Sequence, residues 1–134
     1  MLPSALMLAL VVSACSASGD LSAAEKQVPA FHAMLDGGNL QAIYAASSPE
    51  LKAAASETKF DAFLGAVHQK LGTVKTTRRV NSGFKMGTSG TFVTLVYSTD
   101  FSGGDATETF VYKMNGDKAV LAGYHINSDA LIEK

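Results

Sequence analysis

Cysteine and tryptophan are scarce in this sequence, and their scarcity limits what can hold the fold together. The 134 residues include one cysteine, Cys15, and no tryptophan. A single cysteine cannot form an intramolecular disulfide, so its presence needs another explanation. With 47% apolar residues the chain fits one globular domain. A domain of this size buries about two-thirds of the surface that its unfolded chain exposes, so it needs neither a metal nor a disulfide to fold.

An excess of charge of either sign is also lacking. The 11 Lys and Arg residues nearly balance the 12 Asp and Glu residues, which gives a formal net charge of -1 at pH 7. The sequence shows no basic stripe, so neither nucleic acid nor an anionic membrane surface is an expected partner.

The motifs of common catalytic and cofactor sites are missing as well. The sequence contains neither a Gly-x-Ser-x-Gly elbow nor a phosphate-binding glycine loop. The three histidines, His32, His68 and His125, lie far apart and show no metal-ligand spacing. We therefore expect no metal and no cofactor.

No apolar run is long enough to cross a membrane. The longest, Ala5 to Val12, falls well short of the ~20 residues that a spanning helix needs. It has the length of a signal-peptide core, and the small residues Ser13 and Ala14 follow it. Residues 1–14 contain neither Lys nor Arg, although a signal normally begins with one, so we expect a basic segment upstream.

The position of Cys15 supplies its explanation. Val12-Ser13-Ala14-Cys15 resembles the bacterial lipobox. In that motif the cysteine thiol receives a diacylglycerol, the signal is cut just before the cysteine, and the new amino group is acylated. The resemblance implies a lipoprotein that carries fatty acids such as palmitate on Cys15. Ser16 in the next position implies sorting to the outer membrane, facing the periplasm.

These signals divide the chain into four segments. We predict a signal peptide, a lipidated cysteine with a tether, a single α+β domain and a short tail, over residues 1–14, 15–21, 22–127 and 128–134.

The first half of the domain has helical periodicity. Ser22 and Glu25 fit a capping box, and apolar residues then recur at steps of three and four: Leu21, Ala24, Val28, Phe31 and Leu35. Pro29 within this pattern predicts a kink or a helix start near Val28.

Three further helices are expected before Gly72. The first covers Leu40 to Ala46, and the second begins at Ser48-Pro49. The third has a cap at Thr58 and an apolar stripe that we expect to be buried against a sheet: Phe60, Phe63, Leu64, Val67 and Leu71.

After Gly72 the period changes to that of strands. We predict four strands, over 73–84, 91–101, 106–113 and 118–126. Helices followed by an antiparallel meander define a two-layer α+β domain. The adjacent Arg78 and Arg79 point to opposite faces and are expected to flank the sheet.

The turn around Asn115-Gly116 allows two registers. A two-residue loop at Asn115-Gly116 puts Phe110 and Tyr112 on the face opposite Val120 and Tyr124. We prefer a three-residue loop that begins at Met114, because it gathers the apolar side chains on one face: Phe110, Tyr112, Val120, Ala122, Tyr124 and Ile126.

Several short motifs are similar to one bacterial family. They are Leu71-Gly72 after a helix, Phe101 before a turn, Ala106-x-Glu108-Thr109, Asn115-Gly116 and Ala122-Gly123-Tyr124. Over roughly Ser22 to Asn127 the chain resembles the domain of unknown function 4019, found in small exported proteins. The resemblance implies a cystatin-like or nuclear-transport-factor-2-like fold, a helix layer on a curved sheet, and no established activity.

Glu108 is the candidate site residue, because the preferred register places it on the apolar face opposite Ala122 and diagonal to Tyr124. A carboxylate there must be hydrogen-bonded, paired or protonated. The hypothesis that we favour makes it a structural group in a non-enzymatic envelope module that binds a protein or small ligand. The alternative is a small hydrolase or isomerase with a polar pocket around Glu108, Tyr97 and Tyr124.

Overall fold

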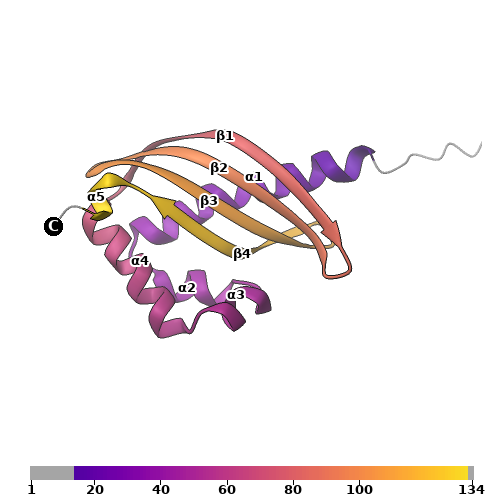
Figure 1. Cartoon of the computed structure of the whole chain (residues 1–134), viewed down its shortest axis with the longest axis horizontal. Coiled ribbons are helices and arrows are strands. Elements are labelled where there is room, and N and C mark those ends of the chain that lie inside the picture. Colours follow the sequence, from indigo (N-terminus) through magenta and orange to yellow (C-terminus); the bar gives the residue numbers. More distant parts are fainter. Residues whose placement is uncertain (1–13, 133–134) are drawn as a thin grey trace, which may run out of the picture.

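The computed structural model describes residues 14–132, so the predicted signal peptide lies outside the described residues. The elements follow the order that the sequence predicts, helices first and strands after (Figure 1). They are α1 (Ala14–Asp36), α2 (Leu40–Ala45), α3 (Pro49–Ala54), α4 (Glu57–Leu71), β1 (Val74–Gly87), β2 (Gly90–Phe101), β3 (Gly104–Asn115), β4 (Lys118–Asn127) and α5 (Asp129–Ile132).

The four strands form one antiparallel sheet in the order β1-β2-β3-β4. This is the predicted meander, and the α+β class is confirmed. The long α1 crosses one face of the curved sheet, while α2, α3 and α4 lie along its β4 side (Figure 1). As a result β1 and β4 are the two edges, with α2, α3 and α4 on the β4 side, while α1 reaches β1 through Asp36, which accepts hydrogen bonds from the backbone N–H of Val74.

Helix α1 differs from its prediction at its start. It begins at Ala14 and runs without interruption through Pro29, so Ser22 is not its cap and residues 16–20 are helical. The predicted helix start near Val28 is therefore wrong. Pro29 is exposed, so the backbone carbonyl that loses its donor lies on the solvent side. The predicted stripe is confirmed, because Ala24, Val28, Phe31 and Leu35 are buried while Leu21 is half-buried.

The short helices begin where serine side chains cap them. Ser48 accepts a hydrogen bond from the backbone N–H of Leu51, as predicted. The cap of α4 is Ser56, which accepts from Lys59, and not Thr58. Gly72 ends α4 with a φ of 76°, a backbone conformation that residues with a Cβ rarely adopt, and a Cβ there would also displace the Ser102 hydroxyl.

Helix α4 buries a narrower stripe than its sequence predicts. Phe60, Leu64, Val67 and Leu71 are buried, but Phe63 is 40% exposed. The prediction that Phe63 is a core residue is wrong. Its ring lies 6.3 Å from that of Tyr124, at the rim of the helix–sheet contact.

The β3–β4 hairpin follows neither predicted register. Asn115 pairs with Lys118, which leaves Gly116 and Asp117 as the turn. A register shift at Val111/Tyr112 then pairs Val111 with Gly123, as in a β-bulge with one extra residue on β4. This shift changes which β4 side chains are buried. Before it, Ala119 and Leu121 are buried on the helix side, and after it Tyr124 is buried there. Val120 and Ala122 are not buried.

None of the helices within residues 14–132 combines the length and apolar character required to cross a membrane. The last element, α5, packs against α4 and β3. Ser128 just before it donates a hydrogen bond of 2.6 Å to the backbone carbonyl of Asp105.

Candidate functional site

Glu108 lies in the middle of β3 on the face that the helices cover. It pairs with Tyr97 on β2 and with Ile126 on β4. The predicted pairing with Ala122 is wrong because the turn at Gly116-Asp117 moves the register by three residues and the bulge moves it by one more. Glu108 nevertheless stays on the helix side, and its exposed fraction is 0%. A carboxylate removed from water in this way must find its hydrogen bonds inside the protein.

Both carboxylate oxygens of Glu108 have partners. Oε1 accepts a 2.5 Å hydrogen bond from Thr99 Oγ1 and lies 2.8 Å from His32 Nε2. Oε2 accepts a 2.6 Å bond from the Tyr124 hydroxyl. An ionised Glu108 takes all three as acceptor, which requires the proton of His32 to be on Nε2. We call these four side chains the Glu108 cluster.

The Glu108 cluster joins one helix to three of the four strands. His32 comes from α1, Thr99 from β2 and Tyr124 from β4. Thr99 also shares a 2.7 Å hydrogen bond with Thr77, which extends the network to the β1 edge. One buried carboxylate therefore links the helix layer to all four strands.

The tyrosines beside Glu108 are held in their protonated form. Burial, followed by the negative charge of Glu108 and the hydrogen bond to it, raises the pKa of Tyr124 far above its usual range. Burial likewise raises the pKa of Tyr112 well above normal. Tyr124 therefore serves as a fixed hydrogen-bond donor to Glu108 and does not exchange a proton near neutral pH.

Aromatic rings enclose the cluster on the remaining sides. The ring of Phe110 lies 5.8 Å from His32 and 5.1 Å from both Phe31 and Tyr124, and Phe101 is 6.4 Å from His32. Apolar walls of this kind exclude water and strengthen the charged hydrogen bonds inside them. The arrangement is that of a sealed structural network.

The structure brings together only part of the predicted site. Tyr124 contacts Glu108 directly, whereas Tyr97 lies opposite it in the ladder and packs its ring 5.8 Å from Phe110. Burial, with the nearby charge of Glu25, raises the pKa of Tyr97.

Sequence reasoning missed His32 and Thr99. The signal for His32 was present, because it is four residues after Val28 and three before Leu35 and so lies on the buried stripe of α1. Thr99 alternates with Tyr97 and Phe101 along β2, and that alternation places it on the buried face.

The other two histidines lie apart from the Glu108 cluster. His68 is half-buried on α4, and His125 is exposed on β4. Within the part of the chain that the structure describes, no group of three His, Cys, Asp or Glu side chains is placed to hold a metal ion.

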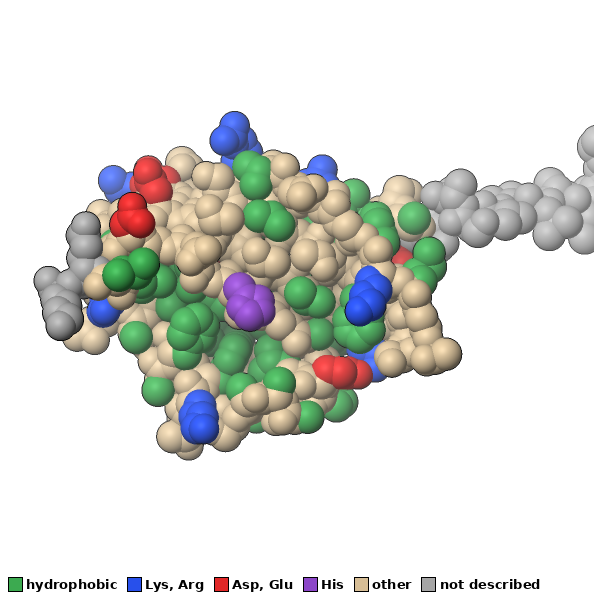
Figure 2. Space-filling view, viewed as in Figure 1, with side chains coloured by type: hydrophobic (Ala, Val, Ile, Leu, Met, Phe, Trp, Pro, Cys, Tyr) green, Lys and Arg blue, Asp and Glu red, His purple; other side chains and the backbone are tan. Residues whose placement is uncertain are grey.

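An apolar groove lies between β4 and the α3–α4 pair. Its volume is about 430 Å³, within the range of ligand sites, and Figure 2 shows apolar side chains in a hollow on this side of the molecule. The lining residues are Leu51, Ala54, Ala55, Lys59, Phe60, Phe63, Ala122, Gly123, Tyr124 and His125. We call this feature the β4 groove. Its only ionisable side chains besides Tyr124 are Lys59 and His125, so the lining carries no acid.

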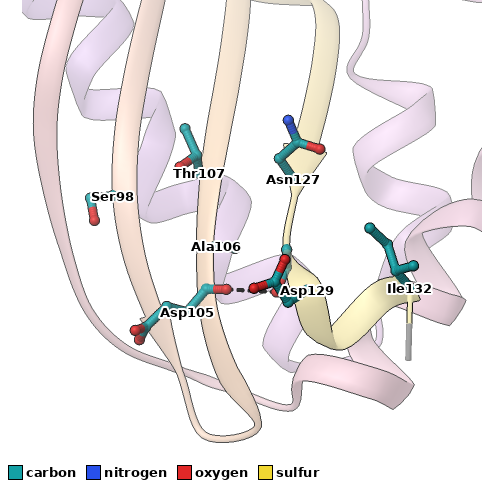
Figure 3. Close-up of a pocket in the computed structure, with 8 residues that line it drawn as sticks. Ser98, Asp105, Ala106, Thr107, Asn127, Asp129 and Ile132 are labelled. Atoms are coloured by element: carbon teal, nitrogen blue, oxygen red, sulfur yellow. Dashed lines mark hydrogen bonds between the residues drawn. The ribbon is translucent and has the colours of Figure 1, made fainter. Parts of the chain in front are cut away.

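A second hollow, of about 270 Å³, lies where β2 and β3 meet α5 (Figure 3). Asp105 and Asp129 both line it, but the carboxylate of Asp105 is turned away from Asp129. A hydrogen bond with Asp100 and the charge of that neighbour raise the pKa of Asp105. The acids therefore do not converge on a common point in this hollow.

These observations define a class of protein: a small α+β domain with a helix layer on a meander sheet, a sealed polar network in its core and an open apolar groove at one sheet edge. The family model described as a protein of unknown function, DUF4019, matches residues 27–124. The chain belongs to this family, which confirms the resemblance found in its short motifs. A comparison with curated proteins finds no match.

Proposed function

We propose that this protein is a lipid-anchored binding module of the bacterial cell envelope that acts by holding a partner and not by catalysis. One contrast carries the proposal: the Glu108 cluster is closed, with both carboxylate oxygens already bonded, whereas the β4 groove is open and apolar. A general base needs access to its substrate, but an apolar groove needs only a complementary ligand.

The anchor in this proposal is lipid on Cys15. Its support is the lipobox-like sequence Val12-Ser13-Ala14-Cys15, with Ser16 favouring the outer membrane and the periplasmic side. Two or three acyl chains, each methylene contributing about 0.8 kcal/mol, hold a protein stably at a membrane.

Cys15→Ser is expected to abolish this anchoring. When the full chain is exported in a bacterial host, the wild type should fractionate with membranes and show the added mass of acyl chains, and the variant should do neither. The matched control is Ser13→Ala, which keeps a small residue before the cysteine. Equal masses for the wild type and Cys15→Ser would contradict the anchor.

The proposed ligand of the β4 groove is a short, extended apolar segment of another envelope protein with an acidic residue near one end. β4 is an edge strand, and among the described residues one backbone hydrogen bond reaches it from beyond the sheet, from Ser48 N to Leu121 O at 2.8 Å. A segment added beside Gly123 and His125 would continue the sheet, with its side chains against α3 and α4. Lys59 supplies the complementary charge.

A photoreactive amino acid at position 63 is expected to crosslink to this partner in cells. Phe63 lines the groove and is 40% exposed, so the substitution does not disturb the core. Thr58, exposed on the same helix outside the groove, provides the control position. A peptide adduct that forms only at position 63 supports the proposal. It should be lost in the Ala122→Asp variant, which places a carboxylate in the groove. Adducts of equal yield at positions 58 and 63, or adducts only to lipid, would overturn the proposal.

A further inference from the structure

The β1 edge exposes apolar side chains that no part of the fold covers. Among the residues whose side chains the structure describes, five large hydrophobic ones are exposed, and three of them belong to this strand: Val80 at 52%, Phe84 at 43% and Met86 at 77%. Every residue of β1 is exposed except Val74 and Gly83, which are half-buried. A single exposed apolar residue needs no explanation, but three on one edge strand mark a surface that meets something.

The same strand is positively charged, so the expectation from the sequence that no basic stripe exists is wrong for β1, and with it falls the reason for excluding an anionic membrane surface. β1 carries Lys75, Arg78, Arg79 and Lys85 and no acidic residue, although acids slightly outnumber bases in the chain. Arg79 pairs with Glu25 of α1 at 3.1 Å, and none of the salt bridges within residues 17–132 involves the other three.

Phe84 pairs with Val93, which is buried on the helix side, whereas Lys85 pairs with Phe92 and Arg78 with Ser98 on the other face of the sheet. The apolar and the basic side chains therefore leave the strand on opposite faces and meet only along the sheet edge. We call Arg78, Val80, Phe84, Lys85 and Met86, taken along this edge, the β1 patch.

The β1 patch ends at the turn that lies at the same end of the molecule as the start of α1. In this meander the β1–β2 and β3–β4 turns share one end of the sheet. Gly19, Ser22 and Ala23 of α1 line a hollow together with Asp117 and Lys118 of the β3–β4 hairpin. At 1.5 Å per residue, Cys15 is about 6 Å further along the helix axis. Figure 1 shows the start of α1 and the β1–β2 turn on the same side of the molecule.

We propose that the β1 patch docks edge-on against the anionic lipid surface to which Cys15 is anchored, with Phe84 and Met86 entering the interface from one side of the strand and Arg78 and Lys85 reaching lipid phosphates from the other. The proposal rests on the anchored module proposed above and deepens it, because a lipid anchor and a basic apolar patch together fix the orientation of the domain. The β4 groove, on the opposite edge of the sheet, then stays open to a partner.

Charge distinguishes this surface from a dimer interface. Edge strands also pair with a second copy of the same chain, but two β1 strands side by side would bring only cations together, and like charges across a ladder are destabilising. A surface of phosphatidylglycerol complements the patch, and each Lys or Arg next to such a surface raises partition roughly five-fold.

Vesicle flotation of the full chain carrying Cys15→Ser tests whether the β1 patch binds a membrane when the protein has no lipid anchor. The probes are vesicles of phosphatidylcholine alone and of phosphatidylcholine mixed with phosphatidylglycerol. We expect flotation with the anionic vesicles, and Lys85→Glu should lower the partition coefficient at least about five-fold while Lys70→Glu, the same change on α4 outside the β4 groove, leaves it unchanged. Equal flotation of these two variants, or no preference for the anionic vesicles, would overturn the proposal.

A fluorescent label provides a second readout that is independent of binding by residues 1–13. The Cys15→Ser chain has no cysteine, so Met86→Cys and Phe63→Cys each introduce one site for an environment-sensitive dye. With anionic vesicles the dye at position 86 should shift to the blue and be quenched by a lipid-buried quencher, whereas the dye at position 63 should stay in water. A dye at position 86 that stays in water on floated protein contradicts docking.

The two proposals fail separately. If the exported wild type carries no acyl mass but position 86 still enters the vesicle surface, the lipid anchor is wrong and the β1 patch stands. If the wild type is acylated and position 86 remains in water, the anchor stands and the patch is wrong.

Discussion

Glu108→Ala is expected to lower the free energy of unfolding by about 3–5 kcal/mol, because each buried donor left without an acceptor costs about 1–3 kcal/mol. The substitution leaves three buried groups without their acceptor: the Thr99 and Tyr124 hydroxyls and the His32 ring. Water cannot replace the lost carboxylate without entering the aromatic enclosure around Phe110 and Phe31. Chemical denaturation followed by circular dichroism measures the effect.

Two controls separate the charge of Glu108 from its shape. Glu108→Gln keeps an acceptor oxygen for one hydroxyl and should cost less, about 1–3 kcal/mol. Thr99→Val removes one donor and leaves the carboxylate with two partners, so its cost should be close to that of a single hydrogen bond, about 1 kcal/mol. If Glu108→Ala instead stabilised the domain, Glu108 would be a strained group kept for function, and the sealed-network interpretation would be wrong.

The helix and strand order was predictable because its signals are local. Ser48-Pro49 starts α3 through a side chain that reaches a backbone N–H three residues ahead, and Gly72 ends α4 because its φ is positive. The change from a period of three or four residues to a period of two at Gly72 likewise depends only on neighbours in sequence. Such signals need no knowledge of what packs on the element.

The register of β3 and β4 could not be predicted from local signals. The shift at Val111/Tyr112 adds one residue to β4. Because side chains alternate between the two faces of a strand, each β4 residue before the shift points to the face opposite the one it would take in an unbroken ladder. Leu121 is therefore buried where the sequence pattern favoured Val120 and Ala122. Nothing near Asn115-Gly116 determines this shift, because it is set by packing of the buried side chains on the helix layer.

Burial on α4 failed to follow its periodicity for a related reason. Phe63 lies on the predicted apolar stripe, but the helix is rotated so that Leu64 and Val67 face the core and Phe63 faces the β4 groove. When the apolar stripe of a helix is wider than the surface on which the helix packs, one of its residues lies at the edge of that contact. The exposed aromatic is the feature that marks the groove, so the failed prediction and the proposed binding site concern the same residue.

The sequence predicted Glu108, the central residue of the candidate site, but not its hydrogen-bond partners His32 and Thr99. Glu108 stood out because a charge in an apolar strand pattern must be satisfied wherever it lies, and this conclusion survives the error in register. His32 and Thr99 are 76 and 9 residues away from it in sequence, so their contact depends on how α1 crosses the sheet. The angle between a helix and a sheet is not encoded in either element alone.

Phe110→Ala is expected to destabilise the domain by about 3–5 kcal/mol, because it removes a fully buried aromatic ring and leaves a cavity. Phe110 has an exposed fraction of 0%, and its ring contacts those of Phe31, His32, Tyr97, Tyr112 and Tyr124. The matched control is Phe63→Ala, which deletes the same atoms from the rim of the groove and should cost less than about 1 kcal/mol. Thermal and denaturant unfolding of both variants measure the difference. If the two variants lost equal stability, the core would not be centred on Phe110, and the assignment of Phe63 to an open groove would be wrong.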